Sequence, residues 1–174
     1  MSGSETGAAP TAERRAWLRE LRRVDERQEN DLAGDFDAHW GEIESMHHSF
    51  VSRFLSKLPA DGRVLDAACG TGKYFPMVLA SGRELLGSDH AGALLAAAAA
   101  KFPQVPTEPY DLQELPHQGE FDGVMCVDAM EFVPPEGWPP VLERFRRALR
   151  PPGWLYLTVE LAPDVFQVGE IAWP

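Results

Sequence analysis

The segment VLDAACGTG, residues 64–72, constrains the fold more than any other part of the sequence. It starts as a short apolar strand, reaches an acidic residue at Asp66, and continues through small residues and two glycines into a helix-like stretch. Small side chains let a ligand approach the backbone closely, and a strand that turns into a helix through such a loop is typical of nucleotide-binding α/β sheets. The segment therefore predicts a ligand site at this turn.

The chain after Gly62 alternates short apolar runs with helix-like segments, which indicates βα units and a parallel sheet. The expected helices lie after Gly72 and over residues 91–101 and 138–149, and Arg150-Pro151-Pro152-Gly153 predicts a sharp turn. The expected strands are residues 63–67, 84–89, 105–111, 121–127 and 154–160, the third being weak. The predicted fold class is therefore α/β, with a mostly parallel sheet and flanking helices.

Helical patterns precede the sheet. One helix is expected over residues 11–31, and a second over residues 36–57, where Trp40 makes the second helix a candidate lid. Residues 1–10 have the small, polar composition of a disordered tail. The expected organisation is thus a tail over 1–10, N-terminal helices on the lid or substrate side over 11–60, and a ligand-binding core over 61–174, all in one domain.

Charge and composition restrict the partners. The formal net charge of −11 disfavours nucleic acid, whose binding depends on neutralising phosphates with Lys and Arg. The N-terminus lacks an apolar leader, and the sequence has no apolar run of about 18 residues, which predicts a cytoplasmic protein without a membrane partner. Cys69 and Cys126 lack metal-ligand spacing, so reduced thiols and no metal site are expected.

Two classes of nucleotide cofactor compete for the glycine loop. A dinucleotide site needs a third glycine where this chain has Phe75, and an aromatic ring there disfavours close packing of the helix. Asp66 would repel a pyrophosphate, whereas it would attract a ligand that carries an ammonium group. The residues favour the second class, and an NAD(P)-dependent oxidoreductase stays open as an alternative.

VLDAACGTG followed by ELLGSDHAGALLAAAAAKFP resembles the first two motifs of the class I, Rossmann-like S-adenosylmethionine-dependent methyltransferases. The resemblance extends over about residues 63–160 and implies S-adenosylmethionine as the cofactor. The net charge of −11, which disfavours nucleic acid, predicts a small-molecule methyl acceptor as the partner. The resemblance assigns the amino-acid part of the cofactor to the end of the first strand and to the loop, that is, to Asp66, Gly70, Thr71 and Gly72. Ala68 stands in this loop where the family often has glycine.

The remaining cofactor contacts are expected at the ends of the next three strands. Asp89 lies near the roughly 20-residue offset at which an acid binds a ribose diol, and the resemblance gives it the same role. His90 is expected beside the adenine through its ring face. Asp111 and Leu112 resemble the family's adenine contacts, although this segment could equally form an Asx turn. Asp128, at the end of the fourth strand, should face the cofactor.

Methyl transfer is an in-line displacement that depends largely on positioning, so a general base is optional. If the acceptor is a hydroxyl or ammonium group, the candidates to take its proton near neutral pH are His39, His47, His48 and Glu131. The sequence leaves open a methyltransferase, a cofactor-binding but inactive or regulatory module, and the oxidoreductase.

The end of the chain also predicts an incomplete sheet. The family's sheet has seven strands and ends in a hairpin beside strand five, but the chain stops at Pro174, which leaves room for at most one short strand over residues 165–168. The C-terminal hairpin is therefore expected to be missing. The edge of strand five would then be covered by the terminal tail or by another chain, which makes a homo-oligomer possible.

Overall fold

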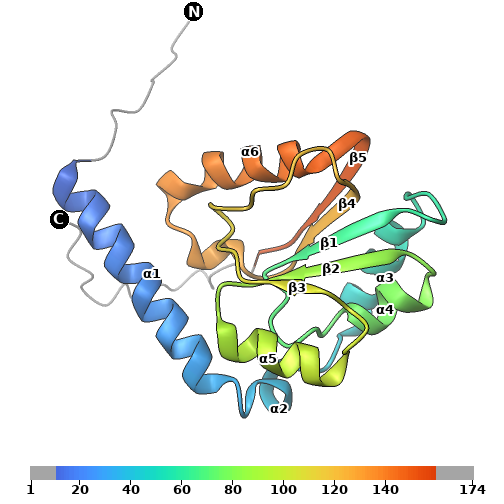
Figure 1. The fold of residues 1–174 in the computed structure, drawn as a ribbon, viewed down its shortest axis with the longest axis horizontal. Coiled ribbons are helices and arrows are strands. Elements are labelled where there is room, and N and C mark those ends of the chain that lie inside the picture. The colour runs from blue at the N-terminus through green and yellow to red at the C-terminus, as the bar shows by residue number, and fades with distance from the viewer. Residues whose placement is uncertain (1–10, 160–174) are drawn as a thin grey trace, which may run out of the picture.

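Within residues 11–159, which the computed structural model describes, a five-stranded parallel sheet forms the centre of the fold (Figure 1). The strand order is β3-β2-β1-β4-β5, and each neighbouring pair is parallel. The strands are β1 (Arg63–Ala67), β2 (Glu84–Ser88), β3 (Thr107–Glu108), β4 (Phe121–Cys126) and β5 (Leu149–Leu157). The predicted α/β fold is confirmed, and the order reverses between β1 and β4, where such sheets bind ligands.

Helices cover both faces of the sheet (Figure 1). Helices α3, α4 and α5 lie on one face and α6 on the other, while α1 runs along the end of the sheet. The helices are α1 (Ala12–Leu32), α2 (Phe36–Trp40), α3 (Ser45–Leu55), α4 (Phe75–Ala80), α5 (Gly92–Lys101) and α6 (Trp138–Ala148), with short 3-10 turns η1 (Met130–Phe132) and η2 (Pro135–Gly137). No helix in the described part of the chain is long and apolar enough to cross a membrane.

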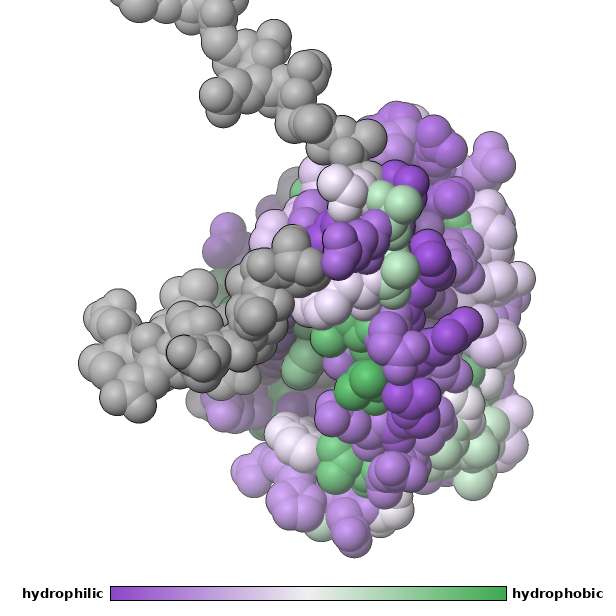
Figure 2. All heavy atoms as spheres, turned by 90° about the vertical axis from the view of Figure 1, so that its left-hand side faces the viewer, coloured by the Kyte–Doolittle hydropathy of each residue, from purple (hydrophilic) through white to green (hydrophobic). Residues whose placement is uncertain are grey.

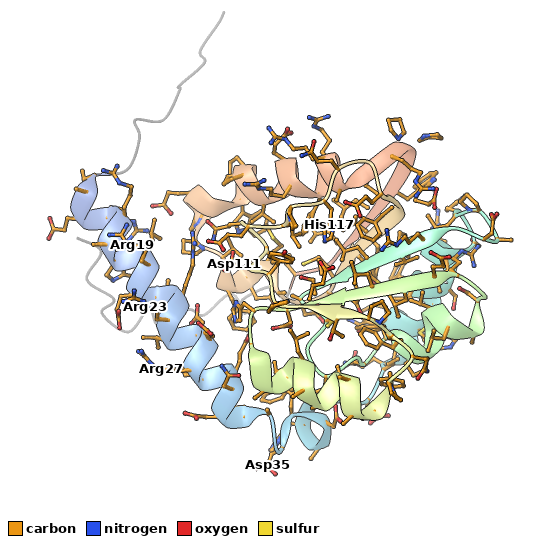
Figure 3. All side chains as sticks on the ribbon, in the orientation of Figure 1. Arg19, Arg23, Arg27, Asp35, Asp111 and His117 are labelled. Atoms are coloured by element: carbon orange, nitrogen blue, oxygen red, sulfur yellow. The ribbon has the colours of Figure 1, made fainter. Side chains whose placement is uncertain are left out.

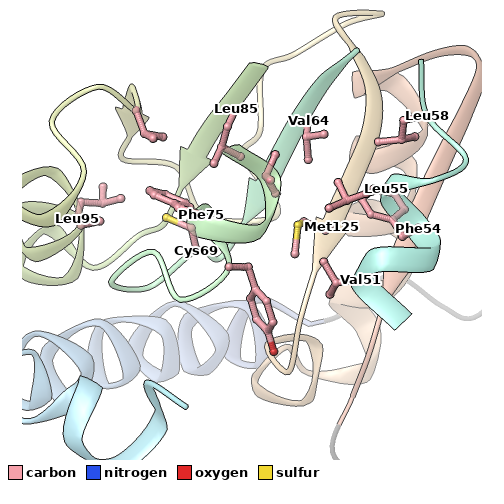
Figure 4. Packing of buried hydrophobic residues seen from close by; sticks show 14 residues of the cluster. Val51, Phe54, Leu55, Leu58, Val64, Cys69, Phe75, Leu85, Leu95 and Met125 are labelled. Carbon is pink, nitrogen blue, oxygen red and sulfur yellow. The ribbon is translucent and has the colours of Figure 1, made fainter. Parts of the chain in front are cut away.

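Alternate residues of each strand supply the two cores. Val64 and Met125 belong to the cluster under α3, α4 and α5, whereas their neighbours Leu65 and Val124 belong to the cluster under α6. Figure 4 shows Phe75 inside the first cluster, near Cys69 and Leu85. Both cysteines are free and buried, as the sequence predicted.

Phe75 takes the place of the third glycine of a dinucleotide-binding fold. Its side chain is completely buried, and a Cβ added to Gly87 of β2 would lie 2.6 Å from the Phe75 Cζ atom. The ring therefore packs directly on the backbone of β2, and it also meets Phe102 edge to face at 5.5 Å. The aromatic ring thus spaces α4 from the sheet, which removes the close helix packing that a pyrophosphate site requires.

The prediction of one helix over residues 36–57 is wrong. The chain forms α2 and α3 instead. Gly41 caps the C-terminal end of α2, and a Cβ at this position would lie 2.4 Å from the carbonyl oxygen of Asp37, so the backbone there requires glycine. Glu44 then has an extended backbone and precedes α3. Because of this break, α2 lies at the end of the sheet, while α3 packs on the face of the sheet that also carries α4 and α5 (Figure 1).

Two strand predictions also need correction. The segment Arg150–Gly153 is no turn before the last strand but an irregularity within β5, since Leu149 pairs with Phe121 and Trp154 already pairs with Gly123. The third strand is only two residues long. The predicted tail over 1–10 and the short strand over 165–168 lie outside the described residues.

Candidate functional site

A crevice opens at the carboxyl ends of β1 and β4. Its larger part has a volume of about 420 Å³ and is lined by the tips of these strands and by residues of α1 and α2. A smaller part of about 60 Å³ adjoins it beside β2 and β3, and both parts share Ala68, Asp89 and Ala129. The larger volume falls in the range of small-molecule sites. The face that carries α1 combines strongly hydrophilic residues with fewer apolar ones (Figure 2).

Asp66, the next-to-last residue of β1, lines the crevice. Its side chain is 1% exposed, and its Oδ2 atom is buried without a hydrogen-bond partner among the described residues. Burial, and after it the charge of Asp89, raise the pKa of Asp66 to about 8. The carboxyl group is therefore largely protonated at neutral pH, and a cation placed beside it would favour its charged form.

Asp89 follows β2 on the other side of the same loop. It is 5% exposed, and its carboxylate accepts hydrogen bonds from the backbone N–H groups of Gly70 at 2.8 Å and Ala91 at 2.9 Å. Burial raises its pKa above the ordinary value. Asp89 thus fixes the glycine loop to the end of β2, and it lines both parts of the crevice.

Only some of the glycine-loop residues that were predicted to bind the cofactor line the crevice. Ala68 and Gly70 line the larger part, whereas Thr71 and Gly72 are not among its lining residues. The Thr71 hydroxyl donates to the Asp37 carboxylate of α2. A Cβ at Gly72, where φ is +83°, would lie 2.8 Å from Phe75. These two residues support the loop from behind.

Ala68 has a φ of +62°, a left-handed conformation that favours glycine. This geometry costs an L-residue about 1–2 kcal/mol, while glycine loses about 0.5–1 kcal/mol through its greater flexibility in the unfolded chain. Ala68→Gly is therefore expected to raise the free energy of unfolding by up to about 1 kcal/mol. Urea denaturation of both proteins tests this, and a clear loss of stability in the variant would contradict it.

His90 is held between two carboxylates at the smaller part of the crevice. Its Nε2 lies 2.6 Å from a Glu29 oxygen on α1, and its Nδ1 lies 3.9 Å from Asp111. The nearby Asp111 carboxylate, and after it the hydrogen-bonded Glu29 carboxylate, raise the pKa of His90 to about 10. The imidazole is therefore charged, and its two nitrogens face carboxylates. His90, Asp111 and Leu112 all line this part.

The loop after β3 forms the Asx turn that the sequence left open. One Asp111 oxygen accepts a hydrogen bond from the backbone N–H of Gln113 at 2.7 Å, and the other faces His90. Asp111 lies between the sheet and α1 (Figure 3). The turn orients its carboxylate toward the crevice, so the turn and a binding role are compatible.

Glu29, Asp89 and His90 also bring three potential metal-binding atoms within 4.8 Å of one another. The sequence predicted no metal site. The 2.6 Å separation between His90 and Glu29 is that of a charge-assisted hydrogen bond. This ion pair accounts for Glu29 and His90, and the hydrogen bonds from Gly70 and Ala91 account for Asp89.

Helix α1 is fastened across the crevice by polar contacts at several points. The Arg14 Nε atom donates to Glu136 at 2.8 Å, and Arg22 donates to Gln113. Farther along, the Asn30 side chain accepts from the backbone N–H of Ala93 at 2.7 Å. These contacts hold α1 across the crevice. Trp40 of α2 lines the larger part and is 48% exposed.

Only some of the candidate proton acceptors lie at the crevice. His39 is exposed, and its Nδ1 lies 2.9 Å from the backbone oxygen of Asp35, while His48 is exposed and lines neither part of the crevice. Glu131 lines the larger part. The structure brings His47 to the site instead, 3.3 Å from the Tyr74 hydroxyl and 3.7 Å from Asp128.

The sequence contains a signal that separates His47 from the other histidine candidates. His47 shares a helical face with Val51 and Phe54, four and seven residues later, and both of these are buried. That spacing separates His47 from His48. Tyr74 directly follows the glycine loop, but nothing in the sequence pairs it with His47. Asp128 lies at the predicted edge, with a φ of +50° and a side chain bound to Thr158 at 2.7 Å.

Known proteins match the chain over the same region. The methyltransferase domain family matches residues 64–153. "Putative methyltransferase YqeM" of Bacillus subtilis (strain 168) is 30% identical over 126 residues, which are 67% of this chain and 48% of that protein. The chain thus spans about half the length of this curated relative.

Solved structures share the fold. An S-adenosylmethionine-dependent methyltransferase from Mesorhizobium loti is 27% identical, with a TM-score of 0.55 over 63% of this chain and 52% of its own. Phosphoethanolamine N-methyltransferase 1 of Haemonchus contortus, in complex with phosphoethanolamine and S-adenosylhomocysteine, is 19% identical, with a TM-score of 0.64 over 85% of this chain and 33% of its own. With the family match over more than half of its length, the chain belongs to the class I S-adenosylmethionine-dependent methyltransferases.

Proposed function

We propose that this protein binds S-adenosylmethionine in the crevice and transfers its methyl group to a small molecule. The observation that carries the proposal is the buried, unpartnered Asp66 oxygen, which lies across the glycine loop from Asp89. A buried carboxyl group without a partner is costly unless a ligand completes it. A cationic amino-acid group is the matching ligand, and the cofactor supplies an electrophilic methyl group when it is bound.

The residues of the crevice fit the parts of this cofactor. Asp66 would hold the ammonium group beside Ala68 and Gly70, while Thr71 and Gly72 shape the loop behind them. Asp89 keeps free lone pairs for the two ribose hydroxyls. The adenine would lie in the smaller part, against the residues His90, Asp111 and Leu112, and Asp128 would border the methyl-donating end.

The charges of the crevice restrict the acceptor. The larger part is lined by one lysine, Lys73, by the largely protonated Asp66, and by the carboxylates of Asp25, Glu29, Asp89, Asp128 and Glu131. This excess of negative charge favours a neutral or cationic acceptor and disfavours a phosphate-bearing one such as phosphoethanolamine. Aromatic side chains complete the walls, namely Phe36, Trp40 and Phe132.

The outer face of α1 gives little support to a nucleic-acid acceptor. Arg19, Arg23 and Arg27 mark this face in Figure 3. Arg23 and Arg27 lie 3.7 and 3.4 Å from the Glu20 carboxylate, so their charges are partly neutralised. The face therefore resembles a solvated helix surface more than a phosphate-binding stripe.

Calorimetric titration with S-adenosylmethionine, S-adenosylhomocysteine, NADH and NADPH, followed by methyl-transfer assays on a panel of neutral, cationic and anionic small molecules, tests the proposal. We expect both sulfur nucleosides to bind, neither nicotinamide nucleotide to bind, and neutral or cationic acceptors to be methylated. Binding without methylation of any acceptor would favour an inactive or regulatory module. Binding of NADH or NADPH alone would favour an oxidoreductase.

Cofactor binding should release about one proton at pH 6.5, because Asp66 holds a proton in the free protein and an ammonium group beside it favours the carboxylate. The pKa of Asp66, about 8, lies above this pH, so the sign is release and not uptake. Calorimetry in buffers of different ionisation enthalpy measures the release, which Asp66→Asn should abolish. A binding enthalpy identical in all buffers would contradict the assignment.

A further inference from the structure

Tyr74, His47 and Asp128 form a chain of polar contacts at the border of the larger crevice. Tyr74 precedes α4, His47 lies on α3, and Asp128 follows β4. The Tyr74 hydroxyl lies 3.3 Å from His47 Nδ1, and His47 Nε2 lies 3.7 Å from an Asp128 carboxylate oxygen. Three separate segments therefore converge on one imidazole ring.

Of these three side chains, Tyr74 and Asp128 line the crevice, and His47 does not. Tyr74, which is 5% exposed, and Asp128 are among the lining residues of the larger part, whereas His47 is not. The His47 side chain is 18% exposed and contacts both of them. Tyr74 and Asp128 thus connect His47 to the crevice.

The protonation state of Tyr74 sets the direction of the hydrogen bonds. Burial, followed by the charge of Asp128, raises the pKa of Tyr74, and Tyr156, Asp66 and Glu44 act in the same direction. The phenol therefore keeps its proton at neutral pH and donates to His47 Nδ1. A neutral His47 then carries its own proton on Nε2, facing the Asp128 carboxylate.

We propose that Tyr74 accepts the proton that a hydroxyl or ammonium acceptor loses on methylation and that His47 stores it. The idea depends on the proposed methyltransferase function. As the acceptor atom bonds to the methyl carbon, the carbon–sulfur bond breaks and its electron pair stays on sulfur. The acceptor's proton moves to the Tyr74 oxygen while the phenol proton moves to His47 Nδ1. The product is a neutral phenol and an imidazolium beside Asp128.

This arrangement gives Tyr74 a catalytic role and His47 a positioning role behind it. Asp128 stabilises the imidazolium by its charge, since opposite charges at this distance favour the protonated form. Its backbone has a φ of +50°, and Thr158 donates to its other carboxylate oxygen at 2.7 Å. A strained residue fixed by two partners holds its carboxylate in one place, as relay geometry requires.

The test compares the variants His47→Asn and Tyr74→Phe with the matched control His48→Asn. His48 is the exposed neighbour of His47 and lines no part of the crevice. Asparagine at position 47 still accepts from Tyr74 but cannot take up a proton. Against an acceptor methylated by the natural protein, we expect kcat to fall by about 100-fold or more in both relay variants. KM, and the Kd for S-adenosylhomocysteine, should change little, and His48→Asn should retain full activity.

An unchanged kcat in a His47→Asn variant that is folded and binds S-adenosylhomocysteine as the natural protein does would overturn the proposal.

Nitrogen NMR of the free protein distinguishes a failed relay from a failed methyltransferase assignment. The relay predicts that neutral His47 carries its proton on Nε2 and that this preference weakens in Tyr74→Phe. A proton on Nδ1, or no change in Tyr74→Phe, overturns the relay whatever the activity. The predicted tautomer in a protein that neither binds S-adenosylmethionine nor methylates any acceptor would overturn the proposed function instead.

Discussion

Phe75→Ala should lower the free energy of unfolding by about 3–5 kcal/mol, the cost of removing a large aromatic side chain from a tight core. Phe75 is completely buried and packs against the backbone at Gly72 and Gly87 and against the ring of Phe102. Gly72 and Gly87, which border the space that the ring would leave, have no side chains to fill it, so a cavity should persist. Equilibrium denaturation with urea, extrapolated to water, measures the change.

Phe50→Ala is the matched control. It removes the same atoms from α3, but Phe50 is 49% exposed and lines no part of the crevice, so its effect should stay within about 1 kcal/mol. A loss of less than about 1 kcal/mol in Phe75→Ala would contradict the packing described above, because the ring would then contribute no more than an exposed one.

Asp89→Ala should weaken S-adenosylhomocysteine binding by about 1–3 kcal/mol, roughly 5- to 150-fold in Kd. The variant loses the proposed ribose acceptor. It also leaves the Gly70 and Ala91 N–H groups without their present partner, so the glycine loop should lose its fixed position. Isothermal titration of both proteins under one set of conditions measures the difference.

Asp61→Ala controls for the loss of one carboxylate, since Asp61 is exposed and lies before β1, at the end of the strand opposite Asp66. Circular dichroism should show that both variants are folded. If Asp89→Ala is folded and binds the nucleoside as tightly as the natural protein does, Asp89 does not hold the ribose.

The strands that carry the site could be predicted well from the sequence. Asp66, Asp89 and Asp128 all follow apolar runs, and the run that became β1 was bounded correctly at residues 63–67 because both faces of a central parallel strand are buried. Since parallel strands end at one edge of a sheet, the three acids were expected together, and the structure places them on one crevice.

The remaining features depend on tertiary contacts that local patterns do not contain. One glycine in a helical pattern is tolerated, so Gly41 gave no clear sign that α2 and α3 separate. The Tyr74–His47 contact joins segments 27 residues apart. The roles of Thr71 and Gly72 behind the loop depend on Asp37 and Phe75, which only the fold brings there.

Strain and unusual charge states concentrate around this crevice. Ala68 and Asp128 are the non-glycine residues with positive φ in the described part of the chain, and both line the larger part. Asp66 and His90 have the raised pKa values described above, and both lie beside other carboxyl groups. Such features cluster at functional sites, because the surrounding fold must hold them in place.

The most direct test of the cofactor assignment is a crystal structure of the protein with S-adenosylhomocysteine. We predict that the ammonium group lies beside the Asp66 carboxylate, that both ribose hydroxyls donate to Asp89, and that the adenine lies against His90 and Leu112. A nucleoside bound outside this crevice, or bound with either acid out of hydrogen-bonding distance, would contradict this prediction.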